Sequence, residues 1–119
     1  MACIQVKRFE APDATRVFAK GRFDLIQMGG LTLGKARYAP GWKWSEAVGV
    51  LTGRTSCDVE HVGIVLSGQA AVRMDDGEER VLKPGDVFEV PPGHDSWVVG
   101  DEPYVSLHFL GAAEYARHK

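Results

Sequence analysis

Two proline-glycine turns on either side of one short segment constrain the fold of this chain more than any other feature. The turns contain Pro84-Gly85 and Pro92-Gly93. Proline presets φ near the value that the second position of a turn requires, and glycine accepts the positive φ that other residues avoid. Between the turns, residues 86–90 alternate polar and apolar side chains, as a strand with one buried face does. Residues 81–97 therefore predict a turn, a short strand and a second turn.

Similar turn signals divide the rest of the chain into short segments. Gly29-Gly30 and the Asp-Asp-Gly sequence at 75–77 are typical of tight β-hairpins. Further strands are predicted over residues 3–9, 22–28, 31–38, 55–66, 69–74, 78–82, 95–99 and 104–110. Residues 45–54 fit neither strand nor helix periodicity and predict a loop, with one helical turn starting at Ser45. Roughly eight to ten short strands without a convincing helix pattern predict an all-β barrel or sandwich.

The length of 119 residues suits one domain with a single core. We expect a barrel over about residues 22–110, preceded by the strand at 3–9 and followed by a tail at 111–119. The tail is expected to be a short helix or a frayed end.

Charge and cysteine content exclude several classes of protein. The formal net charge of −2 is spread along the chain, which argues against binding to nucleic acid or to a membrane surface. No apolar run reaches the roughly 18 residues of a membrane-spanning helix, and the first residues lack the apolar core of a secretory signal. We therefore expect a cytoplasmic location, where Cys3 and Cys57 remain thiols.

The spacing around the two turns resembles a known motif. The second motif of the cupin superfamily is resembled by the spacing of Gly85, five residues, Pro91, one residue and Gly93. The end of the first cupin motif is resembled by His61, six residues and Gly68. The resemblance covers nearly the whole chain and is strongest to small single-domain cupins with a degenerate metal motif. It implies a double-stranded β-helix, the cupin or jelly-roll barrel. Together with the N-terminal strand, it also implies a homodimer.

The match to the metal-binding residues of cupins is partial. In metal-binding cupins a His-x-His sequence and a later glutamate come from the first motif, and one more histidine comes from the second. The resemblance places Thr55 and Cys57 at the two positions of the His-x-His sequence and His61 at the position of the glutamate. Ser96 occupies the position of the last histidine, and the histidine actually present, His94, comes two residues before it.

Strand periodicity groups the inward-facing polar candidates as Cys57, His61, His94 and Ser96. In a regular strand Cys57 and His61 would lie about 13 Å apart, too far for two ligands of one ion. A bulge near residues 58–60 would be needed to bring them together. By the same periodicity Asp95 faces the other way and is expected to form hydrogen bonds at a turn or edge. His108 shares a polar face with Tyr104 and Ser106 that could meet either solvent or a pocket, and the expectation is that His108 lies at the surface.

Two interpretations of these residues stay open. In one, Cys57, His61 and His94 bind one divalent metal, such as zinc, nickel, iron or manganese, and leave a position for water or ligand. In the other no metal binds, Cys57 fills the core, and the two histidines contact a ligand or other pocket groups.

The tryptophans are a second candidate feature. Trp42, Trp44 and Trp97 all fall beside turns, where their rings suit a small, partly planar ligand near a barrel mouth. Alternatively these rings cap the core or form a dimer contact. The residues from 42 to 54 exceed the usual spacing before the first cupin motif and are expected to form a lid or rim. The complete predicted ligand-binding set is Trp42, Trp44, Cys57, His61, His94, Ser96 and Trp97.

Three functions follow from these interpretations. The leading one is a cupin that binds a small molecule of unknown identity, with catalysis left open; without a metal, His61 or His94 could serve as the general base of an isomerase or cyclase. The second is a metal-dependent enzyme, such as an oxygenase, that uses Cys57, His61 and His94. The third is a ligand sensor or binding module without catalysis.

Overall fold

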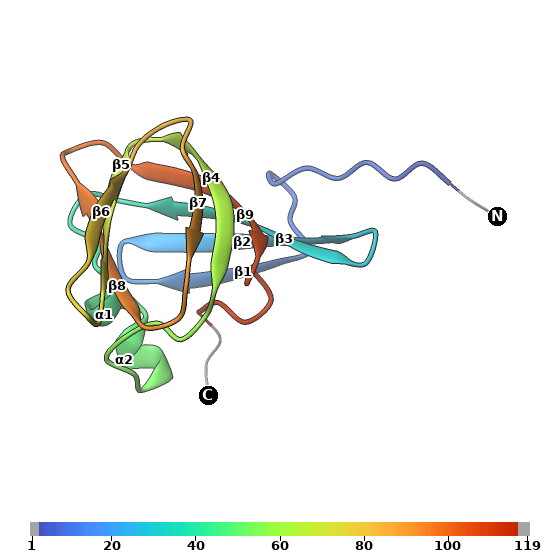
Figure 1. Cartoon of the computed structure of the whole chain (residues 1–119). Coiled ribbons are helices and arrows are strands. Elements are labelled where there is room, and N and C mark those ends of the chain that lie inside the picture. The colour runs from blue at the N-terminus through green and yellow to red at the C-terminus, as the bar shows by residue number, and fades with distance from the viewer. Residues whose placement is uncertain (1–2, 117–119) are drawn as a thin grey trace.

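A computed structural model describes residues 3–116 and shows antiparallel strands arranged as a barrel (Figure 1). One sheet has the order β1-β2-β3-β9-β4-β7 and the other β6-β5-β8. The strands are β1 (Ala14–Phe18), β2 (Gly21–Met28), β3 (Leu31–Tyr38), β4 (His61–Ser67), β5 (Gln69–Met74), β6 (Glu79–Leu82), β7 (Val87–Val90), β8 (His94–Val99) and β9 (Tyr104–Leu110). Two single-turn helices, α1 (Trp44–Ala47) and α2 (Gly49–Thr52), follow β3. The prediction of an all-β barrel is confirmed.

The predicted turns form as expected. Gly29 and Gly30 both have positive φ, 61° and 78°, and join β2 to β3. In the Pro84-Gly85 turn, the amide of Asp86 donates to the carbonyl of Lys83 over 2.9 Å, and Gly93 has φ of 92°. These turns set the lengths of the strands that carry the interior side chains.

The barrel interior is filled largely by aromatic side chains, among them Phe23, Tyr38, Trp42 and Tyr104. Strand β4 alternates strictly, so that His61, Gly63 and Val65 face inward. Because polar residues share the inward faces of several strands with these rings, the interior combines apolar packing with groups that can bind a ligand. Neither helix of the described residues has the length or the hydropathy that crossing a membrane requires.

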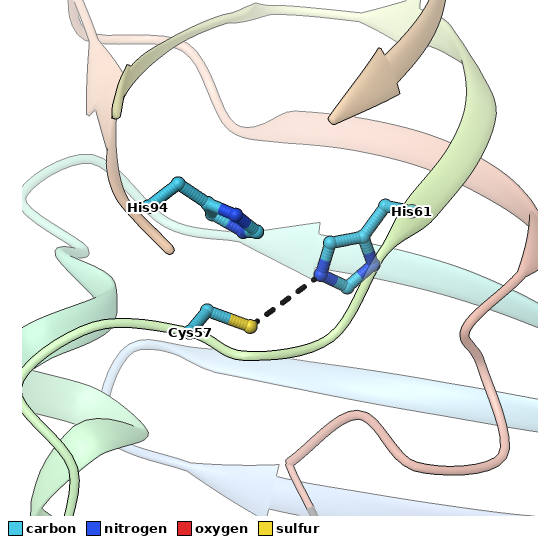
Figure 2. Close-up of side chains that lie close together, drawn as sticks. All are labelled: Cys57, His61 and His94. Carbon is cyan, nitrogen blue, oxygen red and sulfur yellow. Dashed lines mark hydrogen bonds between the residues drawn. The ribbon is translucent and has the colours of Figure 1, made fainter. Parts of the chain in front are cut away.

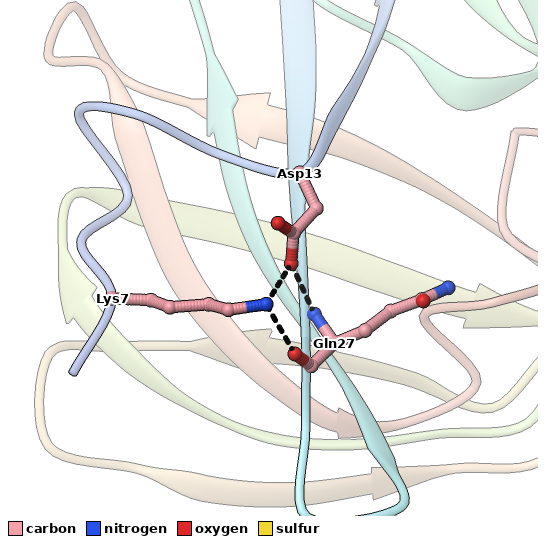
Figure 3. Close-up of polar contacts among 3 residues, drawn as sticks. All are labelled: Lys7, Asp13 and Gln27. Atoms are coloured by element: carbon pink, nitrogen blue, oxygen red, sulfur yellow. Dashed lines mark hydrogen bonds and ion pairs between the residues drawn. The ribbon is translucent and has the colours of Figure 1, made fainter. Parts of the chain in front are cut away.

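The strand predicted at residues 3–9 is wrong. Residues 3–8 form no strand, and Ile4 and Val6 are 95% and 81% exposed, so the alternating apolar side chains have no surface to cover within the described chain. The segment is instead anchored by Lys7, whose Nζ donates to Asp13 Oδ2 over 2.9 Å and to the carbonyl of Gln27 over 2.8 Å (Figure 3). The Gln27 amide also donates to Asp13, and the first true strand, β1, begins at the next residue.

The tail expected at residues 111–119 also differs from the prediction as far as residue 116, where the described part ends. Residues 112–116 form turns rather than a helix or a frayed end, and Ala112, Tyr115 and Ala116 are buried. Arg16 on β1 holds this segment by donating to the carbonyls of Ala112, Ala113 and Tyr115. The segment therefore belongs to the core and places Tyr115 in the barrel interior.

Gly63 allows a close approach between β4 and β9 that any side chain would block. A Cβ atom there would lie 2.1 Å from the carbonyl oxygen of Leu107 and 2.8 Å from the ring of Phe88. We expect Gly63→Ala to lower the free energy of unfolding by about 2 kcal/mol or more, because the strands or the ring must move apart. Urea denaturation measures this. Ser67→Ala, at an exposed position of the same strand, is the control, and equal stability of the two variants would contradict the prediction.

Candidate metal and ligand site

Cys57, His61 and His94 converge inside the barrel (Figure 2). All three side chains are buried, and one potential ligand atom from each lies within 4.8 Å of the others. The Cys57 Sγ and His61 Nε2 atoms are 3.6 Å apart. We refer to these three residues as the Cys-His-His cluster.

The backbone around Cys57 explains how a short sequence interval produces this contact. The predicted strand at 55–66 begins only at His61, and residues 58–60 form no regular structure. Cys57 pairs singly with His94: its amide donates to the His94 carbonyl, and the Gly93 amide donates to the Cys57 carbonyl, both over 2.7 Å. The predicted departure from a regular strand near 58–60 is thus present, and it folds Cys57 back toward His61.

A hydrogen bond fixes the tautomer of His94. Its Nδ1 lies 2.7 Å from the Pro91 carbonyl oxygen, which can only accept, so Nδ1–H donates. The lone pair is therefore on Nε2. Histidines that bind metals commonly donate their second ring nitrogen to a carbonyl or carboxylate in this way.

Burial keeps the cluster uncharged in the absence of a metal. It lowers the pKa of His94, and it lowers the pKa of His61 well below the usual value, with a further contribution from the neighbouring His108 and His94. Burial also raises the pKa of the Cys57 thiol to about 12. At neutral pH the cluster consists of a thiol and neutral imidazoles, so a metal ion would have to displace the thiol proton.

The distance between Cys57 and His61 fits a tetrahedral metal ion. With metal–sulfur and metal–nitrogen bonds of about 2.3 and 2.0–2.1 Å, a tetrahedral ion separates sulfur from nitrogen by about 3.6 Å. The Cys57–His61 distance already has this value. Three protein ligands with a fourth position left over are typical of zinc sites that act on a ligand rather than of purely structural sites.

A small cavity of about 40 Å³ lies beside the cluster. Among the predicted ligand-binding residues, Trp42, Trp44, His61, His94 and Ser96 line it. Its other lining residues are Tyr38, Ala70, Val72, Leu82, Phe88, Val90, Tyr104, His108 and Tyr115. No charged side chain of the described residues contributes to this lining.

The tryptophans divide into two groups. Trp42 and Trp44 are 1% and 2% exposed, and Trp42 stacks on Tyr38 with ring centroids 3.8 Å apart. Trp97 is absent from the cavity lining and is instead approached by Lys43, whose Nζ lies 5.8 Å from the ring centroid. Its predicted place near the ligand therefore lacks support in the cavity geometry.

The expectation that His108 lies at the surface is wrong. His108 is buried, lines the cavity, and its ring centroid is 5.2 Å from that of His61. Its Nε2 forms a 3.0 Å hydrogen bond with Ser106 Oγ. The sequence did contain a signal, because His108 shares strand parity with Tyr104 and Ser106; this polar face turns inward, whereas Phe109 on the opposite face is about half exposed.

Tyr115 was not predicted at all. Its ring centroid lies 5.0 Å from that of His61, and its hydroxyl is 2.8 Å from the hydroxyl of Tyr38. No local pattern marks it, because its position depends on the distant contact that Arg16 makes with residues 112–115.

Asp95 forms hydrogen bonds at an edge, as predicted. Its Oδ1 accepts from the Ser45 amide over 3.0 Å and its Oδ2 accepts from Ser45 Oγ over 2.9 Å. These bonds tie α1 to β8. The insertion at 42–54 thus contributes Trp42 and Trp44 to the cavity wall, and its helical turn begins one residue before the predicted Ser45.

Two larger grooves lie outside the cavity. One, of about 530 Å³, passes the outer side of Cys57 and Trp44. The other, of about 700 Å³, lies between β6 and β7 and shares Val72, Leu82, Phe88 and Val90 with the cavity wall. The second groove is separated from the cavity only by apolar side chains.

Because its buried histidines are neutral, we expect the metal-free protein to be destabilised by acid. Burial lowers the pKa of His108 to about 4, whereas the unfolded chain takes up this proton near pH 6.5. The contribution of neutral His108 to the free energy of unfolding is therefore fully present above about pH 6.5. It falls as the pH decreases toward about 4, because the unfolded state binds more protons over this range. His108 alone should account for about 3 kcal/mol of the loss.

Denaturant unfolding at a series of pH values measures this effect. The variant His108→Gln cannot titrate but retains a group that can hydrogen-bond to Ser106. It should show a smaller decrease between about pH 6.5 and 4 than the wild type. Identical pH profiles would contradict the assignment of a depressed pKa to His108.

Comparison with known proteins agrees with this architecture. A family model described as a cupin domain matches residues 44–109, which is more than half of the chain. No curated protein sequence matches the chain significantly.

Solved structures show the same fold at low sequence identity. A protein of unknown function from Rhizobium leguminosarum bv. viciae 3841 has a TM-score of 0.64 and 22% identity over 92% of this chain and 97% of its own. A DUF1255 protein of unknown function from Acinetobacter sp. ADP1 has a TM-score of 0.60 and 16% identity over 82% and 90% of the two chains. A cupin-like protein from Thermotoga maritima has a TM-score of 0.54 and 19% identity over 77% and 68%. The matched motifs, the barrel and the shared fold lead to one conclusion: the chain belongs to the cupin family.

Proposed function

We propose that this cupin binds a small molecule beside one divalent transition-metal ion held by Cys57, His61 and His94. The observation that carries the proposal is the convergence of one sulfur and two imidazole ligand atoms within 4.8 Å in the barrel interior. One thiolate and two imidazoles favour zinc, iron or nickel over the harder ions magnesium and calcium. When bound, such an ion polarises a ligand oxygen or lowers the pKa of a water molecule.

The protein groups around the cluster have separate roles in this proposal. The Pro91 carbonyl orients the His94 ring, and the backbone pairing of Cys57 with His94 holds the thiol close to both imidazoles. The cavity beside the cluster supplies the place for the ligand, and aromatic side chains form much of its wall. We assign Trp42, Trp44 and Ser96 to the ligand-binding wall, because each lines this cavity.

A second candidate is supported by the protonation states of the histidines. Because the pKa values of His61 and His94 are lowered, both imidazoles are neutral at physiological pH and can accept a proton without a metal. This is the chemistry of a metal-independent isomerase or cyclase with His61 or His94 as general base. A binding module without catalysis would use the same cavity. Metal analysis and turnover measurements separate the metal-dependent protein, the metal-independent enzyme and the binding module.

Metal binding tests the proposal directly. We expect the wild type to bind one equivalent of zinc, with release of about one proton per ion near neutral pH, because the thiol must ionise and the imidazoles are already neutral. Cys57→Ala and His94→Gln should each weaken zinc binding by more than about 100-fold, since loss of an outer-shell partner alone typically weakens it by about 10- to 100-fold. Isothermal titration calorimetry in buffers of different ionisation enthalpy reports both the zinc affinity and the number of protons released.

The matched control for Cys57→Ala is Cys3→Ser, which removes the exposed cysteine. Cys3→Ser should bind zinc like the wild type. Cobalt(II) provides an independent readout, because its thiolate charge-transfer absorption should be lost in Cys57→Ala and retained in Cys3→Ser. A folded wild type that binds neither ion would refute the metal site and leave the metal-independent candidates.

We further propose that the chain forms a homodimer through its N-terminal segment. Ile4 and Val6 are almost fully exposed on an extended segment whose base is anchored by Lys7 (Figure 3). Deletion of residues 1–6 should convert a dimer to a monomer, as measured by light scattering at micromolar concentration, whereas Val87→Ser, at an exposed site on β7, should leave the mass unchanged. A monomeric wild type would refute the dimer.

A further inference from the structure

The interior contains buried hydrogen-bond donors that have no acceptor. The indole Nε1–H groups of Trp42 and Trp44 lie out of contact with solvent, and no described residue accepts a hydrogen bond from either. An indole nitrogen can only donate. Each unpaired buried donor costs about 1–3 kcal/mol, and native proteins retain few of them without a water, ion or ligand as partner.

Two imidazole nitrogens are unpaired in the same region. The Nδ1 atoms of His61 and His108 are buried without a partner among the described residues. If a metal occupies Nε2 of His61, as proposed above, the proton of this ring is on Nδ1 and adds a third unpaired donor. All four residues with an unpaired nitrogen line the one small cavity beside the Cys-His-His cluster.

The cavity restricts what can supply the missing acceptors. Its volume of about 40 Å³ exceeds the roughly 10–15 Å³ that one water requires but accommodates only a group of a few heavy atoms. Of its polar lining groups, the hydroxyls of Tyr38 and Tyr115 are already bonded to each other, and Nε2 of His108 is already bonded to Oγ of Ser106. A group that accepts several hydrogen bonds and donates none therefore fits the lining better than one that must also donate.

Charge balance points to a single negative charge on this group. No Asp, Glu, Lys or Arg side chain of the described chain lines the cavity. A divalent ion with one thiolate and two neutral imidazoles carries a net charge of about +1. One monovalent anion neutralises this charge, whereas a dianion would leave an uncompensated buried charge.

We propose that the cavity is a binding site for the carboxylate group of a small monocarboxylic acid, with the indole N–H groups of Trp42 and Trp44 as its hydrogen-bond donors. The inference rests on the proposed metal site for its charge balance, whereas the unpaired donors stand independently of the metal. It names the class of ligand and assigns the two tryptophans a polar role in addition to packing.

The test uses the zinc-loaded protein labelled with ¹⁵N at tryptophan, in which the three indole N–H groups give separate resonances. Sodium acetate and sodium formate are the probes, and acetamide and methylammonium chloride are the matched neutral and cationic controls. Acetate should shift the Trp42 and Trp44 resonances in a saturable manner and leave Trp97, which lies outside the cavity, unchanged. Its affinity should exceed that of acetamide by at least about tenfold.

Two substitutions that retain an aromatic ring but remove the N–H group complete the test. Trp42→Phe and Trp44→Phe should each weaken acetate binding by about 5- to 20-fold. Trp97→Phe, the matched control, should bind acetate like the wild type and assigns the third resonance. Far-ultraviolet circular dichroism confirms that each variant is folded. If one of the two fails to fold, the indole shifts in the wild type still decide the question.

The outcomes separate this inference from the proposed function. If zinc binds but neither carboxylate shifts the Trp42 and Trp44 resonances, or if acetamide binds as tightly as acetate, the carboxylate site is refuted and the metal site stands. If zinc does not bind, the metal site is refuted, and the same titration of the metal-free protein decides the carboxylate site by the presence or absence of the two indole shifts.

Discussion

The backbone pairing between Cys57 and His94 is the contact on which the rest of the interior depends. Two hydrogen bonds of 2.7 Å join a segment without regular structure to the start of β8. This pairing lets a cysteine only four residues before His61 approach the histidine ring, which a regular strand would prevent. The same Pro-Gly turn that supplies the Gly93 amide also supplies the Pro91 carbonyl that orients His94. One turn therefore positions both the thiol and the second imidazole.

Desolvation determines the chemical state of these groups. The interior is lined by aromatic and aliphatic side chains, so burial disfavours every charged form and shifts each pKa toward the neutral species. The consequence is a set of ligands that is fully available to a soft or borderline cation, apart from one proton on sulfur. The aromatic packing thus has a chemical role as well as contributing to stability.

Much of the fold could be predicted from sequence because the decisive signals are local. Turn residues at fixed positions and strand periodicity identify the hairpins and most strands. The spacing of the motif residues points to Cys57 and His61, and strand periodicity adds His94. The prediction for His108 was wrong because periodicity shows which residues share a face but does not show which face is inward. Here the polar face of β9 is the buried one, and only the pairing of β9 with β3 and β4 establishes that.

The remaining errors share a second cause, which is dependence on contacts between distant parts of the chain. Tyr115 reaches the cavity because Arg16, nearly a hundred residues earlier, bonds the carbonyls around it. Residues 3–8 have the alternation of a strand, but a strand also needs a neighbouring strand to pair with. Among the described residues they pair with none, and Lys7 anchors the segment through Asp13 and the Gln27 carbonyl instead. Neither relation can be derived from composition, periodicity or spacing.

The groove between β6 and β7 has a consequence for how such a protein can diversify. Both strands are the last of their sheets, so each pairs on one side only. The wall that the groove shares with the cavity consists of Val72 of β5, Leu82 of β6, and Phe88 and Val90 of β7. Val72 and Leu82 are partly exposed, unlike the three residues of the cluster. Substitutions at Val72 or Leu82 would remodel the wall between the groove and the cavity without altering Cys57, His61 or His94. The border of the barrel can therefore change during evolution while the Cys-His-His cluster is inherited unchanged.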